Sequence, residues 1–550
     1  MDKIRESIHV DNTIKTPYGD KKICYLDYIA SGRPSRLIDD IMNEQYIPYY
    51  ANTHSSTSEL SIRCNKGREK ARELILKYCG GTNIHSLVFV ANGATGASNL
   101  LADMIFRMER IRKAKKIVVF NTIYEHHSNI LPYREKKCTI EILRMDGDAI
   151  DYKYFEERLS LHSKDSVIIA AISACSNVTG LLTDTDKVTQ LVHKYGGLVF
   201  FDYAANAPYE KIDMKMKDAI FFSMHKFIGG QGCPGILIFK KYLFKDIKPR
   251  VVGGGTVKFV SKKKHVYLKT IERHEAGTPN VLGCIRAGLA FQLKQTIGIN
   301  TIHETEGRFV TTAMHKLSQM ENICIVGNVV NAPRLAFFSF LVKHENMFMH
   351  PDFCCMLLND MFGIQMRSGC MCAGPYVEHL LGLKNTDKLE MVLDKYPFIK
   401  PGVCRFSLNY FISQDEFNYV MACMDFISRH GYKFLLHYTI SGGEWTHRTP
   451  VKRRDFDIET CNFNKNYFKE EILMDSDANM FEMQMKFANE EMSKIKVEKG
   501  RDYHIYEDKM ELSAISALER VRWFVYPFEI ANQLTNGSYM TQVRKCFVKV

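Results

Sequence analysis

The sequence contains no run of about 18 apolar residues, the length that a membrane-spanning helix needs. Its first stretch, MDKIRESIHVDNTIKTPYGD, is polar and mixed in charge, so it lacks the apolar core of a signal peptide. The acidic residues in this stretch are also atypical of a transit peptide. We therefore expect a globular, cytoplasmic protein that has no membrane partner.

The sequence also lacks a dense cysteine framework and a long run of basic residues. The 16 cysteines are scattered over 550 residues, which favours reduced thiols over the disulfide framework of a short secreted domain. The net charge of +12 is spread along the chain, with KKK at 262–264 and KRR at 452–454 as its short clusters. We interpret both clusters as solvated loops and predict no nucleic-acid partner.

Short apolar runs alternate with helical patterns between residues 85 and 245. Near-continuous apolar runs are typical of strands that helices cover on both faces. The runs are SLVFV (86–90), KIVVF (116–120), SVIIAAIS (166–173), LVFFD (198–202), AIFF (219–222) and GILIF (235–239). Helical stretches such as GASNLLADMIFRMERIRKA separate them, so the region predicts a mostly parallel α/β sheet.

Polar or glycine-rich turns follow five of these runs. The turns are ANGATGAS, NTIYEHHSN, ACSNVTG, DYAANAPY and SMHKFIGGQG. In open α/β sheets, ligands bind outside the carboxyl ends of the strands. Five such turns therefore predict one site that all of them assemble.

A length of 550 residues suggests two or three domains. We expect a large domain over residues 45–299 and, where helices with shorter strands begin, a smaller α+β domain over 300–434. The segment 1–44 would join the small domain. Residues 435–550 differ in composition and hold both tryptophans of the chain. We interpret them as a C-terminal extension that covers the core, with a partner surface as the alternative.

Lys226 is the first candidate for covalent chemistry. It follows a predicted strand in SMHKFIGG, and alone it would be read as a surface loop lysine. Asp202, however, ends the neighbouring predicted strand. Pyridoxal 5′-phosphate (PLP) needs a lysine for its Schiff base and a carboxylate that keeps its pyridine nitrogen protonated. The pair therefore favours a PLP site.

Two further turns suit such a cofactor. Backbone N–H groups in ANGATGAS, at the start of a helix, could bind a phosphate. Glycine-rich turns also occur where the backbone only needs to turn tightly, without any ligand. His126 in EHHSN could lay its ring on the cofactor, or it could be an ordinary loop histidine.

In this order, these residues resemble the class V aminotransferase family, especially its cysteine desulfurase and selenocysteine lyase branch. The likeness covers roughly residues 24–430. Its motifs are YLDYIASG, ANTHSS, EHHSN, SNVTG, DYAANAP, SMHK, HEAGTPN and RSGCMCAGP. The resemblance implies a PLP-dependent transferase of fold type I that acts on an amino acid as a homodimer.

The resemblance also implies roles for matching residues. Lys226 would carry PLP, Asp202 would pair with the pyridine nitrogen, and His126 would stack on the ring as a catalytic residue. The phosphate would contact Ala94, Thr95, Ser223, His225 and, from the partner subunit, Thr278. The substrate would contact Arg405 through its carboxylate, together with Arg367, His54 and Asn177, and Asn177 would also reach the cofactor. Read without the family, Arg405 could equally form a surface ion pair.

Cys372 falls where desulfurases keep their catalytic cysteine. It would take sulfur from L-cysteine as a persulfide, release alanine and pass the sulfur to an acceptor protein, and nearby Arg367 would favour the thiolate. Cys370 and Met371 stand where that branch often has histidines, and Ala205 stands where it has a glutamine. These departures favour the alternative of an aminotransferase, epimerase or lyase acting on another amino acid.

The two cysteines of the C-x-C pair allow other interpretations as well. They could be a buried structural pair, and Cys370 could assist or replace Cys372. No matching second pair is evident, so we predict no metal site. A non-enzymatic scaffold is the third alternative, but a scaffold would need none of Lys226, Asp202, His126 and Arg405.

Overall fold

The computed structural model describes residues 1–8, 13–53, 55–147, 149–245, 247–327, 332–383, 387–449, 451, 477–505, 512–537, 539 and 548. His54 and the basic cluster at 452–454, both named from the sequence, lie outside the described residues.

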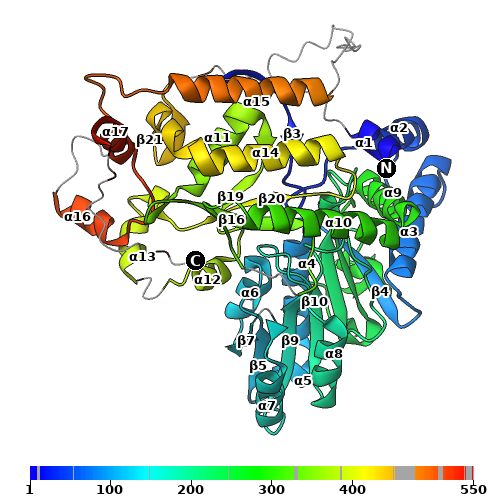
Figure 1. Ribbon diagram of the computed structural model, residues 1–550. Helices are drawn as coiled ribbons and strands as arrows, with labels where there is room; N and C mark the ends of the chain where they lie inside the picture. Colours follow the sequence, from blue (N-terminus) through cyan, green and yellow to red (C-terminus); the bar gives the residue numbers. More distant parts are fainter. Residues whose placement is uncertain are drawn as a thin grey trace.

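A seven-stranded sheet forms the centre of the large domain (Figure 1). Its strands, in spatial order, are β4 (His85–Val90), β12 (Gly235–Lys240), β11 (Ala219–Ser223), β10 (Leu198–Asp202), β9 (Val167–Ser173), β5 (Ile117–Asn121) and β6 (Thr139–Ile142). β12 runs antiparallel to both of its neighbours, β11 and β4, and the other pairs of adjacent strands in this sheet are parallel. The predicted mostly parallel α/β sheet is therefore confirmed. The sequence reading missed β6, a half-exposed edge strand that lacks a continuous apolar run.

Helices cover both faces of this sheet. Adjacent residues of a strand point to opposite faces, so Val118 packs on one side and Val119 on the other. The first face is covered by α3 (Glu59–Tyr78), α7 (Tyr152–His162), α8 (Thr185–Lys194) and α9 (Val281–Ile297). The second face is covered by α4 (Gly93–Arg107), α5 (Glu109–Arg112) and α6 (His127–Arg134). Burial on both faces explains why the strands are nearly all apolar.

The small domain is built on an antiparallel sheet. Its strands are β15 (Ile323–Ile325), β16 (Phe337–His344), β20 (Val403–Ser407) and β19 (Arg367–Gly369), with β17 (Met347–Met349) also paired to β16. Helices α10 (Ile299–Ser318), α11 (Pro351–Phe362) and α14 (Gln414–His430) share its hydrophobic core. The N-terminal segment contributes β3 (Cys24–Tyr25), which pairs in parallel with β18 (Ile364–Gln365). The Leu26 carbonyl then accepts a 2.7 Å hydrogen bond from the Ser407 N–H, which ties this segment to β20.

The C-terminal extension shares the core of the small domain. Trp445 and Trp523 are fully buried in it, and the Trp523 indole N–H donates to the Ile399 carbonyl at 3.0 Å. Phe524 pairs with Phe348 of β17 in a parallel bridge. The helices of this part are α15 (Asp477–Lys494), which packs along α14, α16 (Leu512–Val521) and α17 (Pro527–Asn536) (Figure 1). The described part of the C-terminal extension therefore helps to complete the small domain.

Shorter elements connect these parts. They are α1 (Asp2–Ser7), β1 (Thr13–Thr16), β2 (Gly19–Lys22), α2 (Arg36–Ile41), β7 (Met145–Asp146), β8 (Ala149–Ile150), β13 (Val257–Val260), β14 (His265–Tyr267), α12 (Gly374–Leu380), α13 (Asp387–Leu393), β21 (Tyr438–Ser441) and β22 (Glu444–His447). Among the described helices, none has both the length and the apolar character needed to cross a membrane.

Candidate active site

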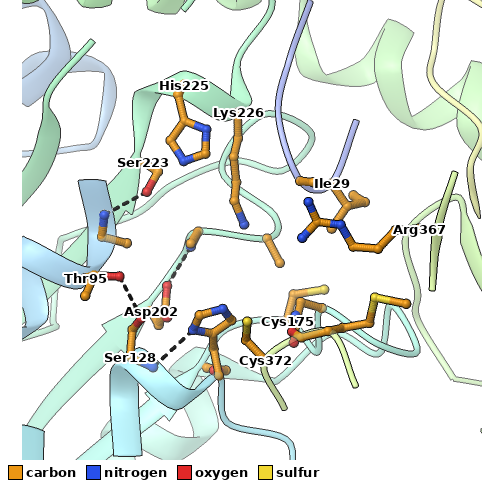
Figure 2. A pocket seen from close by; sticks show the side chains of 18 of the residues that line it. Ile29, Thr95, Ser128, Cys175, Asp202, Ser223, His225, Lys226, Arg367 and Cys372 are labelled. Carbon is orange, nitrogen blue, oxygen red and sulfur yellow. Dashed lines mark hydrogen bonds between the residues drawn. The ribbon is translucent and has the colours of Figure 1, made fainter. Parts of the chain in front are cut away.

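A cavity of about 180 Å³ lies at the carboxyl edge of the large sheet, where the small domain faces it. The large domain contributes Ala94, Thr95, His126, Asn177, Asp202, Ser223, His225 and Lys226 to its lining. The small domain contributes Arg367, Cys372 and Arg405. The structure thus brings together residues from all five polar turns singled out in the sequence (Figure 2).

Lys226 reaches into this cavity from a 3₁₀ turn (η3, Met224–Lys226) directly after β11 (Figure 2). Burial lowers the pKa of Lys226 to about 8, against the opposing effect of the Asp202 charge. Asp202 ends β10, is only 5% exposed, and accepts a 2.8 Å hydrogen bond from the Ala204 N–H. Burial raises the pKa of Asp202 to about 6. A buried carboxylate with one hydrogen bond can accept a further cationic N–H partner.

The start of α4 forms one end of the cavity. The Ala94 N–H donates to the Ser223 hydroxyl at 2.7 Å, and the Thr95 and Ser128 hydroxyls lie 2.7 Å apart. Gly93 has φ +62°, and a Cβ there would lie 2.7 Å from the Ser223 oxygen, so the close approach requires glycine. Hydroxyls and N–H groups at a helix start form a suitable cradle for a phosphate.

Two histidines at the cavity are held neutral. Burial, followed by the charge of Lys226, lowers the pKa of His126 to about 3. His126 Nδ1 accepts a 3.1 Å hydrogen bond from the Ser128 N–H, which fixes the ring at the start of α6. Burial and Lys226 likewise lower the pKa of His225 to about 4. A neutral, fixed imidazole such as His126 is suited to stack on an aromatic ring.

Arg405 and Arg367 are cross-strand neighbours on β20 and β19. Arg405 is only 3% exposed, so the surface ion pair considered from the sequence does not describe it. Its guanidinium donates to the Asn177 carbonyl at 2.7 Å and to Asp27 Oδ1 at 2.9 Å. Arg367 is about half exposed and donates to Asp27 Oδ2 at 3.1 Å. One carboxylate is therefore shared by two arginines beside the cavity.

Asn177 links the two domains at the cavity. Its side-chain amide donates to the Met371 carbonyl at 2.7 Å. Its Oδ1 is buried and accepts no hydrogen bond from any described residue. This oxygen is an acceptor that a hydrogen-bond donor on a bound ligand could satisfy.

Cys372 is exposed and stands in a tight turn between β19 and α12. The Ala373 N–H closes the turn on the Cys370 carbonyl at 2.9 Å. Met371 and Cys372 both adopt left-handed backbone conformations, with φ +53° and +55°. Cys370 is partly buried and packs against the small-domain core. Of the two cysteines, Cys372 is the one that lines the cavity.

Three residues at the site were not singled out from the sequence. Asp27 pairs with both arginines, and His127 hydrogen-bonds the Cys372 turn. Glu125 is fully buried below the cavity and accepts hydrogen bonds from Ser173, Asn129 and Thr122, which joins the ends of β9 and β5. Burial raises the pKa of Glu125. All three residues lie within the motifs YLDYIASG and EHHSN, which could have marked them as candidates for the site.

Thr278 does not line the cavity of its own chain. It is exposed and lies in a loop that Glu275 fixes to the large domain. Glu275 accepts hydrogen bonds from the Phe89 N–H at 2.7 Å and from Arg72 at 2.8 Å. Among the described residues, no group of three or more His, Cys, Asp or Glu side chains has the arrangement of a metal site.

The lining fits PLP in its chemical groups. A lysine amine, a buried carboxylate, a neutral histidine and a hydroxyl-lined helix start occupy one cavity. The unsatisfied Asn177 oxygen supplies a polar contact that the described residues do not use. Each of these groups has a counterpart on the cofactor: an aldehyde, a pyridine nitrogen, an aromatic ring and a phosphate.

Comparisons with known proteins agree with this chemistry. Proteins described as probable cysteine desulfurases from Halalkalibacterium halodurans and Staphylococcus aureus are each 28% identical; the matches cover 65% and 66% of this chain and 86% and 85% of theirs. The solved structure of a cysteine desulfurase from Thermococcus onnurineus aligns with a TM-score of 0.65 at 23% identity, over 78% of this chain and 98% of that one. One from Escherichia coli aligns with a TM-score of 0.59 at 22% identity, over 73% and 93%.

The structural likenesses establish the fold, which is that of PLP-dependent transferases of fold type I. The family described as aminotransferase class-V matches residues 24–420, most of the chain and nearly all of both domains around the cavity. The chain is therefore a member of the aminotransferase class-V family of PLP-dependent enzymes.

Proposed function

We propose that this protein is a cysteine desulfurase, which converts L-cysteine to alanine and retains the sulfur as a persulfide on Cys372. The observation that carries this proposal is an exposed thiol in the same cavity as Lys226 and Asp202. The names of the curated relatives support it.

The large-domain residues would bind and orient the cofactor. Asp202 would pair with its ring nitrogen, and His126 would pack on its ring. The phosphate would lie against the start of α4, in contact with Ala94, Thr95, Ser223 and His225. When bound, PLP supplies an electron sink for charge that develops at the substrate Cα.

Lys226 and Arg405 would act directly on the substrate. Arg405 would bind the substrate carboxylate, for which its planar guanidinium offers two parallel N–H groups. Lys226, whose pKa burial lowers to about 8, would remove the proton from Cα in its neutral form. Asn177 would contribute its free Oδ1 to the bound pair of cofactor and substrate.

Cys372 would carry out the sulfur transfer. Its thiolate attacks the substrate sulfur, and a bond forms between the two sulfurs as the bond from that sulfur to Cβ breaks. The electron pair of the broken bond stays with the substrate, whose Cβ takes a proton, so that alanine leaves. The persulfide then lies on an exposed turn, where an acceptor protein could reach it.

We also propose that the enzyme is a homodimer in which Thr278 reaches the phosphate of the partner's cofactor. Thr278 is exposed and does not line the cavity around Lys226. Large apolar side chains that are at least half exposed gather in the same region of sequence: Val251, Val252, Phe259, Val260 and Val266. Phe259 and Val266 are cross-strand partners in the β13–β14 hairpin, and neighbouring exposed apolar side chains of this kind are typical of a surface that another chain covers.

A second candidate function rests on Ala205. This residue lines the cavity where the desulfurases carry a glutamine, and its methyl group offers no hydrogen bond there. It favours an aminotransferase, epimerase or lyase that acts on another amino acid through the same Lys226.

Alanine formation from L-cysteine by the PLP-loaded protein separates the two functions. We expect alanine from the wild type and from Cys370→Ser, and none from Cys372→Ser. Alanine from Cys372→Ser but not from Cys370→Ser would move the persulfide to Cys370. No alanine from a wild type that holds PLP would refute the desulfurase and leave the second candidate.

A further inference from the structure

His127 lies outside the cavity lining but contacts the Cys372 turn at two points. Its backbone N–H donates to the Cys372 carbonyl at 2.7 Å. Its Nε2 accepts a 3.0 Å hydrogen bond from the Gly374 N–H. His127 is the first residue of α6 in the large domain, whereas the turn belongs to the small domain. These two hydrogen bonds therefore cross between the domains at the reactive cysteine.

The Cys372 turn has a backbone that needs such support. Two consecutive residues with side chains, Met371 and Cys372, have φ near +55°, a region that residues other than glycine rarely adopt. Conformations of this kind persist only where the surroundings hold them. The internal bond from the Ala373 N–H to Cys370 closes the turn, and Asn177 holds the Met371 carbonyl from the large domain. His127 forms hydrogen bonds with the Cys372 carbonyl and with the Gly374 N–H.

Packing and protonation both suit this role. A Cβ added at Gly374 would lie 3.3 Å from His127 Nε2, so the ring and the turn are in close contact. Because Nε2 accepts a hydrogen bond, the ring is neutral, with its proton on Nδ1. Burial, with the charges of Lys400 and Arg134, lowers the pKa of His127 and favours this neutral form.

We propose that His127 is a positioning residue that holds the Cys372 turn in its left-handed conformation and so aims the thiol at the substrate sulfur. The inference rests on the proposed desulfurase function for its catalytic consequence. The His127 side chain accepts the hydrogen bond from the Gly374 N–H. Without that bond, the hydrogen bond from its backbone N–H to the Cys372 carbonyl is the one that remains between His127 and the turn.

Hydrogen–deuterium exchange of the PLP-loaded protein tests the contact without reference to catalysis. The variants are His127→Leu, which removes the acceptor, and His127→Gln, which can restore one. In His127→Leu we expect the peptide that contains Ala373 and Gly374 to exchange about tenfold faster or more, with protection of β10 and β11 unchanged. His127→Gln should exchange close to the wild type. Wild-type protection in His127→Leu would overturn the inference.

Steady-state kinetics test whether the contact from His127 affects catalysis. In His127→Leu we expect kcat for alanine formation to fall about tenfold to a hundredfold, while KM and the cofactor absorbance stay near those of the wild type. His127→Gln should recover most of kcat. A loss of cofactor binding together with kcat, not relieved by glutamine, would show a merely structural role and overturn the inference.

The two proposals fail in different ways. A wild type that forms no alanine would refute the desulfurase, whereas the exchange of Gly374 would still decide whether His127 holds the turn. Gly374→Ala provides a second test on the other partner. It keeps the histidine but crowds Nε2, and it should speed exchange in the same peptide.

Discussion

The two walls of the cavity are built in different ways. On the large-domain wall, Asp202, Ser223 and Lys226 stand at or just after the ends of adjacent strands, so one sheet brings them together. On the small-domain wall, Arg367 and Arg405 meet through antiparallel pairing, and Cys372 stands on a turn that the other domain holds. The first wall follows from local sequence order, whereas the second depends on contacts between distant parts of the chain.

The largest expected effect comes from breaking the large-domain wall at Lys226. In Lys226→Ala we expect alanine formation to fall about 10³-fold or more, because both the covalent link to PLP and the proton acceptor are lost. Dialysis should then remove the cofactor, which absorbance would show. Lys215→Ala, at an exposed lysine outside the cavity, is the matched control. Retention of covalently bound PLP by Lys226→Ala would contradict the assignment.

The small domain, which forms the second wall, should become less stable when a large side chain is removed from its core outside the cavity lining. Trp523 is fully buried, and Trp523→Ala should lower the free energy of unfolding of this domain by about 3–5 kcal/mol. Trp445 lies in the same core, so its fluorescence during urea unfolding reports on this domain. Trp523→Phe should lose less. An unchanged unfolding midpoint in Trp523→Ala would show that the extension does not support the small domain.

Charge on the large-domain wall sets the pH at which the cofactor is taken up. PLP reacts with a neutral amine, so uptake by the apoprotein should rise with pH and level off above the Lys226 pKa of about 8. The Asp202 charge favours the ammonium form, and Asp202→Asn should therefore shift this inflection to lower pH. It should also weaken PLP binding by about tenfold, because the ring nitrogen loses its carboxylate.

Rates of PLP uptake measured at a series of pH values check this prediction. Asp165→Asn, which removes an exposed carboxylate outside the cavity lining, should leave the profile unchanged. An inflection that moves to higher pH in Asp202→Asn would contradict the sign of the effect.

The smallest expected effect is on the small-domain wall, at Asp27. A substrate carboxylate must compete with this carboxylate for Arg405. Asp27→Asn should therefore lower KM for L-cysteine by about twofold to tenfold, with little change in kcat. Steady-state kinetics at constant ionic strength would measure it. A raised KM would mean that Asp27 orients Arg405 and does not compete for it.

The same contrast explains what could be predicted from the sequence. The strands of the large sheet could be predicted because they are buried on both faces and consist almost entirely of apolar residues. The polar turns after them were predicted to meet, because parallel strands present their carboxyl ends at one edge. The family resemblance added Arg367, Arg405 and Cys372, which periodicity and spacing alone did not single out.

The missed contacts are those between residues far apart in the chain. Asp27 and Arg405 are separated by 378 positions, and His127 and Gly374 by 247. No local pattern marks which acidic residue or histidine will meet which distant partner. The left-handed backbone conformation of Met371 and Cys372 could not be predicted either, because neither residue type favours it.

The parallel bridge between Phe348 and Phe524 has a consequence for how the enzyme is made. On the ribosome, the large sheet has all its strands once Lys240 has emerged, so the surroundings of Lys226 can form early. The small domain must wait for Trp523 and Phe524, which are translated long after Lys240, before its core closes. The half of the site that carries Cys372 is thus completed after the half that carries Lys226.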